Sequence, residues 1–250
     1  MQQQKQFKVL LIGDSCTDKY VYGSVNRLNP EAPVPILDFS KTEIRKGMAG
    51  NVYSNLSSFG LDITMLTNKE SITKTRYIDE KSNQQILRVD EECDIKPLGD
   101  DTPLEGFDVL VISDYNKGFV TSKKIFELVK SFDGPVFIDS KKTDLPVDNA
   151  YIKINDLEHS KLKNKNNPNL IITRGSKGAE FRGKIYPAKD VDVFDVVGAG
   201  DTFLSTLVYF YLKYGRIERA IPFANNAAAI SVSHTGTYVL TGEDIDALYN

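Results

Sequence analysis

The sequence of 250 residues contains few of the side chains that most often build metal centres and nucleophilic active sites. It has two cysteines and two histidines. Cys16 and Cys93 lack the spacing of metal ligands, so we expect two reduced thiols and no zinc site. His159 and His234 stand in helical or loop contexts, where packing or surface roles are the more common. Hydrolysis by a Ser/His/Asp triad is therefore not favoured.

A charge excess and a long apolar run are also absent. The net charge is −3 with both signs interspersed, so the chain lacks the basic surface that binds nucleic acid. No apolar run approaches the roughly 20 residues that span a bilayer, and residues 1–6 lack the apolar centre of a signal peptide. These features predict a soluble, cytoplasmic protein without nucleic-acid or membrane partners.

Two common phosphate-binding motifs are missing as well. No Gly-x-x-x-x-Gly-Lys-Ser/Thr occurs, which excludes a P-loop mechanism. No Gly-x-Gly-x-x-Gly follows the first expected strand, which disfavours a dinucleotide-binding fold.

What the chain does contain is a regular alternation of short apolar runs and helical patterns. With 41% hydrophobic residues it can bury a large core, and we expect one α/β domain over residues 1–250. The alternation is typical of a mostly parallel sheet covered by helices. Expected strands lie at 9–12, 109–112, 136–138, 152–154 and 170–173, a hairpin at 179–185, and helices at 49–59, 122–132, 201–215 and 217–234.

Two segments interrupt this alternation. Residues 19–39 and 75–89 read as further strands, and we expect a small antiparallel sheet outside the main one, contributed by about 18–46 and 74–92. Such a sheet can cover a ligand site as a lid and exclude water from it. An ordinary edge hairpin is the alternative interpretation.

The most informative segment runs from Asp195 to Phe203. If a helix begins here, its first free N–H groups and its dipole make a seat for a phosphate or a developing anion beside Gly198, Ala199 and Gly200. Asp201 at the same helix end suits a base that takes a proton from a substrate hydroxyl. The structural alternative is an ordinary helix cap, since aspartate and glycine are common at helix starts.

Other polar residues follow the expected strands directly. In an open α/β sheet, ligands bind outside the carboxyl ends of the strands, so we expect several of these side chains to converge there. Asn51, in the small-residue segment 46–51, offers both a donor and an acceptor to a ligand. The residues that follow strands are Asp14, Asp18, Asp114, Asn116, Lys117, Asp139, Lys141, Asn155, Glu158, Arg174 and Gly175.

With these residues placed, the chain resembles the ribokinase-like, or PfkB, family of carbohydrate kinases over most of its length. Residues 195–203 match the family's second signature and residues 47–51 its glycine-rich first signature. Asn155 and Glu158 match its Asn-x-x-Glu motif, and residues 173–175 its nucleotide-side strand end. The resemblance implies a three-layer fold with a mostly parallel central sheet and a small antiparallel β lid.

Within the family, the chain is most similar to the kinase domains of the bifunctional enzymes that make ADP-heptose. The similarity is carried by Gly13, Asp14, Asp18 and Tyr20 and by residues 29–35, 84–90 and 113–118. It implies phosphorylation of a heptose 7-phosphate at its anomeric hydroxyl by ATP with Mg²⁺.

The resemblance also implies the role of each candidate residue. Asp201 would be the base, and the N–H groups of residues 198–200 would stabilise the transferring phosphoryl group. A monovalent cation is a further candidate cofactor, and a homodimer through the lid a candidate assembly. The implied substrate-binding residues are Asp18, Gly47, Asn51 and Lys117; the implied nucleotide-binding residues are Asn155, Glu158, Thr173, Arg174, Gly175 and Asn225, with Glu158 also near the metal, indirectly.

Two departures from the family pattern bear on these expectations. Met48 stands where the family usually has a second glycine, which is expected to narrow or reshape the sugar pocket. Between Leu66 and Thr75 the chain is shorter than is usual, which is expected to trim one edge of the sheet. The alternatives that stay open are a hexose-phosphate or nucleoside kinase, a non-catalytic sugar- or nucleotide-binding protein on the same scaffold, and an interaction-only protein.

Overall fold

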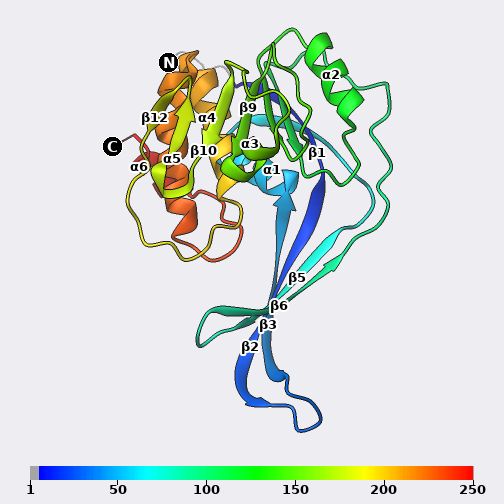
Figure 1. Cartoon of the computed structure of the whole chain (residues 1–250), viewed down its shortest axis with the longest axis vertical. Coiled ribbons are helices and arrows are strands. Elements are labelled where there is room, and N and C mark those ends of the chain that lie inside the picture. Colours follow the sequence, from blue (N-terminus) through cyan, green and yellow to red (C-terminus); the bar gives the residue numbers. More distant parts are fainter. Residues whose placement is uncertain (1–5, 250) are drawn as a thin grey trace.

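The computed structural model describes residues 6–249, and in that range a large sheet lies between two layers of helices (Figure 1). The large sheet has the strand order β12-β11-β10-β9-β8-β7-β1-β4. All its pairs are parallel except those of β11, which runs antiparallel to β10 and β12. The strands are β1 (Lys8–Gly13), β4 (Asp62–Thr67), β7 (Val109–Asp114), β8 (Val136–Ser140), β9 (Tyr151–Asn155), β10 (Leu170–Thr173), β11 (Ala179–Phe181) and β12 (Lys184–Tyr186).

Helices cover both faces of this sheet because its strands carry apolar side chains on both faces. In β1, Val9 and Leu11 belong to one apolar core and Leu10 and Ile12 to the other. The first core is completed by α1, α4 and α5, the second by α2. The helices are α1 (Ala49–Ser58), α2 (Ser122–Ser131), α3 (Asp156–Lys161), α4 (Ala199–Tyr214), α5 (Ile217–Val232) and α6 (Gly242–Ala247), with a short 3-10 turn at Gly175–Lys177.

The helix that follows the Gly-Ala-Gly turn is α4, and glycines bound it at both ends. Gly198 and Gly215 both have left-handed backbone angles, with φ of 78° and 67°, which glycine adopts without steric cost. Residues 201–208 are all buried. The helix is thus held firmly in the first core, with its N-terminus at the carboxyl edge of the parallel strands.

Four strands form the smaller sheet, which projects away from the main body (Figure 1). They are β2 (Ser15–Leu28), β3 (Pro35–Met48), β5 (Thr73–Asp79) and β6 (Gln84–Glu91), in the order β3-β2-β5-β6. The fold class expected from the sequence is confirmed, with one correction to the smaller sheet. Its central pair, β2 and β5, is parallel, because the chain passes through α1 and β4 between them and does not turn back in a hairpin.

The connection between β4 and β5 consists of residues 68–72 alone. β4 is the edge strand of the main sheet and pairs only with β1. The short segment after Leu66 therefore leads directly from the main sheet into the smaller one.

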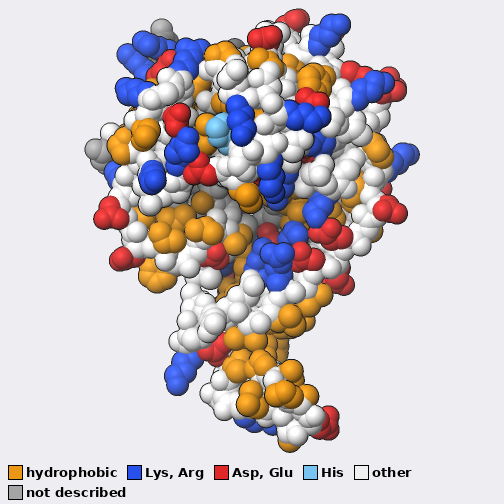
Figure 2. Space-filling model, viewed as in Figure 1, with side chains coloured by type: hydrophobic (Ala, Val, Ile, Leu, Met, Phe, Trp, Pro, Cys, Tyr) orange, Lys and Arg blue, Asp and Glu red, His pale blue; other side chains and the backbone are white. Residues whose placement is uncertain are grey.

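Apolar side chains lie exposed on the smaller sheet (Figure 2). They are Leu28, Val34, Phe39, Ile44, Ile86, Leu87 and Val89. Pairing of two copies through this surface stays a prediction.

Some element boundaries differ from expectation. The helix expected to reach residue 234 ends at Val232. Helix α3 was not expected, although its capping box, with Asn155 and Glu158 each bonding the other's backbone N–H, is a helix-start signal. Both cysteines are free thiols, as expected. Between residues 6 and 249, no helix combines the length and apolar character needed to cross a membrane.

Phe137 of the central strand β8 tests how far this core determines stability. It is 1% exposed, and its ring centroid lies 5.3 Å from that of Tyr151 and 5.2 Å from that of Tyr211. We expect Phe137→Ala to lower the free energy of unfolding by about 3–5 kcal/mol, because it leaves a cavity. Chemical denaturation measures this change. The matched control is Phe126→Ala on α2, where the side chain is 43% exposed; an equal loss in both variants would contradict the assignment of the core.

Candidate active site

Asp201 occupies the first turn of α4 and is 2% exposed. Its carboxylate accepts hydrogen bonds from the Tyr115 hydroxyl at 2.6 Å and from the Asn51 side-chain amide at 3.0 Å. Each donor takes one carboxylate oxygen. Because an ionised carboxylate has about four acceptor positions, each oxygen keeps room for one further hydrogen bond.

Burial raises the pKa of Asp201 to about 6. The hydrogen bonds from Tyr115 and Asn51 act in the opposite direction and hold the pKa down. A carboxylate with a pKa just below neutrality is ionised at pH 7 yet basic enough to take up a proton, which is the balance that a general base requires.

The turn before Asp201 presents backbone N–H groups at the start of α4. Among the described residues, the N–H groups of Gly198 and Gly200 have no acceptor, whereas that of Ala199 lies 3.4 Å from the Val196 carbonyl. Free N–H groups at a helix N-terminus favour an anion. A side chain at Gly198 would lie 2.7 Å from the Asn51 amide, so glycine is required for this close approach.

Two cavities meet at this turn. One, of about 530 Å³, is lined by Gly198 and Asp201 on one side and by residues of the smaller sheet on the other. The second, of about 360 Å³, is lined by Ala199 and Gly200 and by the ends of β9 and β10. We call them the lid cavity and the body cavity. The turn therefore separates two compartments and contributes to both.

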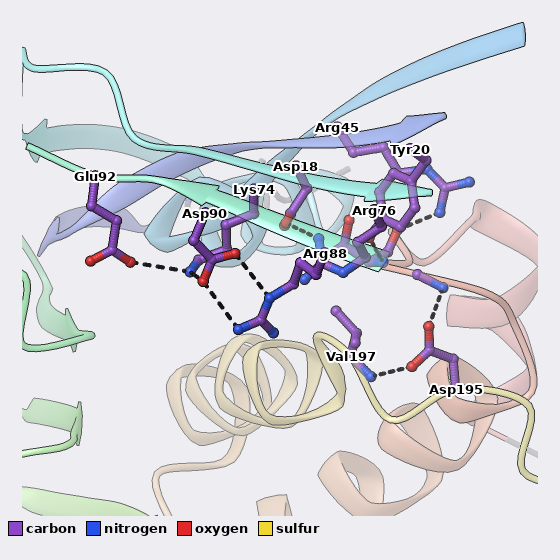
Figure 3. Close-up of polar contacts among 12 residues, drawn as sticks. Asp18, Tyr20, Arg45, Lys74, Arg76, Arg88, Asp90, Glu92, Asp195 and Val197 are labelled. Carbon is purple, nitrogen blue, oxygen red and sulfur yellow. Dashed lines mark hydrogen bonds and ion pairs between the residues drawn. The ribbon is translucent and has the colours of Figure 1, made fainter. Parts of the chain in front are cut away.

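Charged side chains surround the lid cavity (Figure 3). Lys74 lies 3.3 Å from Asp90 and 3.5 Å from Glu92, and Arg88 lies 2.9 Å from Asp90. The side chain of Lys117 pairs with Glu92. These residues form a cluster of cations in which each is already paired with a carboxylate.

The expected substrate residues occupy different places around the lid cavity. Asp18 and Lys117 line it, and Asn51 reaches it through Asp201. Asp18 forms a buried ion pair with Arg76. Gly47 does not line the cavity; its Cα faces the Asp18 carboxylate, and a side chain there would overlap that group. Its role in the structure is to let β3 approach Asp18 closely.

Most of the expected nucleotide residues line the body cavity, namely Asn155, Thr173, Gly175 and Asn225. The side chain of Arg174 does not line it: its guanidinium bonds Glu180 at 2.7 Å and Asp156 at 2.5 Å. The Glu158 carboxylate accepts the N–H of Asn155 at 2.9 Å as part of the cap of α3. Neither of these two residues lines the cavity, and both side chains are bonded to protein partners.

Lys153 was not singled out from the sequence. It is buried on β9, lies 2.7 Å from the Asp139 carboxylate, and lines the body cavity. Burial lowers the pKa of Lys153, but the Asp139 carboxylate raises it by more, so the pKa is raised overall. A Cβ at Gly200 would lie 2.7 Å from the Lys153 ammonium. A fixed positive charge thus stands beside the N-terminus of α4.

Within residues 6–249, no group of three or more His, Cys, Asp or Glu side chains forms a metal-binding cluster. Mg²⁺ is often held by one or two carboxylates together with substrate phosphates. Burial, then the neighbouring Asp139 carboxylate, raises the pKa of Glu158. Asp139 is itself paired with Lys153 at 2.7 Å, so Glu158 is left as the candidate carboxylate for a cation at this place.

Met48 has an unusual backbone conformation. It precedes α1 with φ of 55° and ψ of −132°, a combination that L side chains rarely adopt and that costs of the order of 1–3 kcal/mol. Its side chain is buried and lines the lid cavity. It fills space that a glycine would leave open.

The site contains residues that sequence reasoning did not assign to it, notably Tyr115, Arg76 and Lys153. A lysine inside the apolar strand 151–155 was the one available signal, since an unpaired buried charge is costly. Tyr115 lies directly after β7, where polar residues were expected to converge, but its contact with Asp201 joins distant segments. The contact of Arg76 with Asp18 also joins distant segments, and no local pattern predicts it.

Comparison with curated proteins finds relatives of similar sequence. The "Bifunctional protein HldE" of Nitratiruptor sp. is 30% identical over 298 residues, covering 96% of this chain and 64% of the relative. That of Campylobacter curvus is 30% identical over 307 residues, covering 98% of this chain and 65% of the relative. The chain thus spans slightly less than two thirds of these relatives' length. Since the aligned regions are longer than 250 residues, the relatives carry insertions relative to this chain.

Solved structures with the same fold include two sugar-kinase structures. Phosphofructokinase-2 from Escherichia coli, in complex with potassium, aligns with a TM-score of 0.71 at 14% identity and 98% coverage of both chains. Ribokinase from Thermotoga maritima aligns with a TM-score of 0.69 at 17% identity, covering 97% of this chain and 99% of that one. At these identities the likeness establishes the fold.

A match to a known family comes from the sequence. Residues 152–242, which contain the body cavity's strand ends, the turn and α4, match the pfkB family carbohydrate kinase pattern. The resemblance expected from the signatures is confirmed: residues 152–242 match the pfkB family of carbohydrate kinases, and the HldE relatives are similar over almost the whole chain.

Proposed function

We propose that the chain transfers the γ-phosphoryl group of ATP to a hydroxyl of a phosphorylated sugar, with D-glycero-D-manno-heptose 7-phosphate, at its anomeric hydroxyl, as the favoured acceptor. One observation carries the proposal. The turn 198–200 and Asp201 stand between two cavities, so an acceptor in the lid cavity and a nucleotide in the body cavity would meet at a base and at unpaired N–H groups.

The chemistry follows from this arrangement. Asp201 takes the proton of the acceptor hydroxyl, whose oxygen then bonds to the γ-phosphorus while the bond from that phosphorus to the ADP oxygen breaks. The N–H groups of Gly198 and Gly200, with the Lys153 ammonium, stabilise the negative charge on the transferring group. Mg²⁺, when bound with the nucleotide, neutralises phosphate charge, and Glu158 would hold it indirectly.

The cations of the lid cavity support a phosphorylated acceptor. Lys74, Arg88 and Lys117 line the cavity and are held by Asp90 and Glu92. A phosphate would exchange these partners for its own charge-assisted hydrogen bonds. The similarity to HldE proteins supports a heptose phosphate in particular.

Replacement of the base tests the reaction directly. We expect Asp201→Asn to lower kcat by about 10²–10⁴, because the amide cannot take up the proton. Sugar-dependent ADP release measures turnover, and calorimetry measures ATP binding, which we expect to stay nearly unchanged. Asp192→Asn, an exposed change in the preceding loop, is the matched control. Full turnover by the Asp201 variant would refute the assignment of the base.

The pKa of Asp201 predicts a dependence of rate on pH. Since the ionised form is the base and its pKa is about 6, kcat should fall about tenfold per pH unit below that value. Tyr115→Phe removes a hydrogen bond that lowers this pKa, so its acid limb should move to higher pH. Steady-state rates between about pH 5 and pH 8 measure the fall in kcat of the wild type and its shift in Tyr115→Phe. If the rates of the wild type and of Tyr115→Phe fell at the same pH, the Tyr115 hydrogen bond would not control the pKa of Asp201.

Loss of a lid-cavity cation tests the acceptor class. We expect Lys117→Gln to raise the KM for the sugar phosphate about tenfold or more, with the KM for ATP unchanged, because a charged contact to phosphate is lost. Lys96→Gln, exposed and outside the cavity, is the control. Assays with heptose, hexose and nucleoside acceptors, each with and without phosphate, complete the test. A preference for unphosphorylated acceptors would rule out this substrate class.

A further inference from the structure

The smaller sheet contacts the main body at a turn that is distant from it in sequence. Residues 235–237 follow α5, and three parts of the smaller sheet bind them. From β2, the Tyr20 hydroxyl accepts the N–H of Thr237 at 3.1 Å. From β3, the Arg45 guanidinium donates to the carbonyls of Thr235 and Thr237, at 2.8 and 3.0 Å. We call residues 235–237 the clasped turn.

Further contacts make this attachment specific. From the loop between β5 and β6, the Asn83 amide donates to the Thr235 hydroxyl at 2.9 Å. Gly236 lies so close to the Tyr20 ring that a Cβ there would be 2.8 Å from it, and its φ is 74°. The clasped turn thus needs glycine at its centre both for its backbone angle and for contact with Tyr20.

Tyr20 is itself fixed by two cations. It is fully buried, and the guanidinium groups of Arg45 and Arg76 lie over its ring, 4.9 and 5.3 Å from the centroid (Figure 3). Arg76 is also the partner of Asp18 in the lid cavity. Cation–π contacts of this kind stabilise a desolvated ring. The position of the Tyr20 hydroxyl therefore depends on Arg76, which lines the lid cavity.

On its other side, the clasped turn contacts the segment 195–200, which contains the turn 198–200; we call this segment the anion-binding turn. The Asp195 carboxylate accepts the N–H of Gly236 at 2.9 Å and that of Val197 at 3.0 Å, and so joins the two segments (Figure 3). A Cβ at Gly198 would lie 3.3 Å from the Cα of Thr237. Contacts therefore run without a gap from the smaller sheet, through the clasped turn, to the backbone that presents its N–H groups to the phosphoryl group.

The clasped turn also faces the lid cavity. Thr237 lines the lid cavity, and its hydroxyl is buried with no hydrogen-bond partner among the described residues. A buried hydroxyl without a partner costs free energy, and an acceptor in the cavity would supply one. The turn is thus shaped by the smaller sheet on one side and open to a ligand on the other.

We infer that Tyr20 and Arg45 are positioning residues for phosphoryl transfer: by holding residues 235–237, they hold the anion-binding turn in its productive geometry. This inference rests on the proposed function. Neither residue touches the transferring group. Their effect passes through the clasped turn and Asp195 to Val197 and Gly198. Their loss therefore changes the chemical step and leaves nucleotide binding largely intact.

Steady-state kinetics of Tyr20→Phe and Arg45→Gln test this inference. Tyr20→Phe keeps the ring and removes only the acceptor of the Thr237 N–H, and Arg45→Gln removes the two carbonyl contacts. We expect kcat per folded molecule to fall at least about tenfold in each, since small displacements of catalytic groups cost up to about 10²-fold. The KM values for ATP and for the sugar phosphate should stay within about twofold of the wild type. Arg45→Lys should recover part of the rate.

The matched control is Lys41→Gln. Lys41 lies on the same strand, pairs with Glu43 at 2.8 Å as Arg45 does, and makes no contact with the clasped turn. Its kcat should equal that of the wild type. A raised KM for the sugar with unchanged kcat would overturn the inference, because it would make Tyr20 and Arg45 part of the sugar pocket. A lower melting temperature with unchanged kcat per folded molecule would overturn it as well, since only stability would then be affected.

Hydrogen exchange provides a readout that does not depend on activity. In Arg45→Gln, the amides of Val197 and Gly236 should exchange faster than in the wild type, because the segment that Asp195 joins has lost its attachment. Faster exchange confined to the smaller sheet would contradict the inference. A wild-type protein without kinase activity on any acceptor would instead refute the proposed function, and the exchange experiment would still decide whether the two turns are coupled.

Discussion

The structure depends on a carboxylate that is buried at the N-terminus of a helix and kept ionised by two hydrogen bonds. Burial alone would favour the neutral form of Asp201. Tyr115 and Asn51, from two other segments, act against that effect, so that the pKa rises only to about 6, and they also fix the direction of the carboxylate. Free N–H groups at the same helix end favour negative charge on a transferring group. The proposed base and the proposed anion site are therefore held by one element, α4, whose buried residues anchor it in the core.

The parallel topology explains why the partners of Asp201 meet there. The main strands end at one edge, so residues that follow β7, β9 and β10 converge although they are far apart in sequence. The smaller sheet closes the remaining side and contributes the charged residues of the lid cavity. In the proposed reaction, the body cavity would hold the nucleotide and the lid cavity the acceptor, with the turn 198–200 between them.

The sequence predicted those features that local patterns encode. The alternation of strands and helices and the turn 198–200 required only short windows, whereas the roles expected of the residues at strand ends stay predictions. The parallel pairing of β2 with β5 escaped prediction because it depends on a long crossover. The contact between Tyr20 and Thr237 joins residues 217 positions apart, and no periodicity encodes such a pair. Helix α3 was missed because Asn155 and Glu158 were interpreted only as ligand-binding residues, whereas they also cap it.

The most direct test of the account is a crystal structure with a non-hydrolysable ATP analogue and heptose 7-phosphate bound together. We expect the acceptor hydroxyl to lie within hydrogen-bond distance of the Asp201 carboxylate. The γ-phosphate should contact the N–H groups of Gly198 and Gly200, and the sugar phosphate should contact Lys117. A complex in which the acceptor hydroxyl lies away from Asp201, or in which the nucleotide avoids the body cavity, would contradict it.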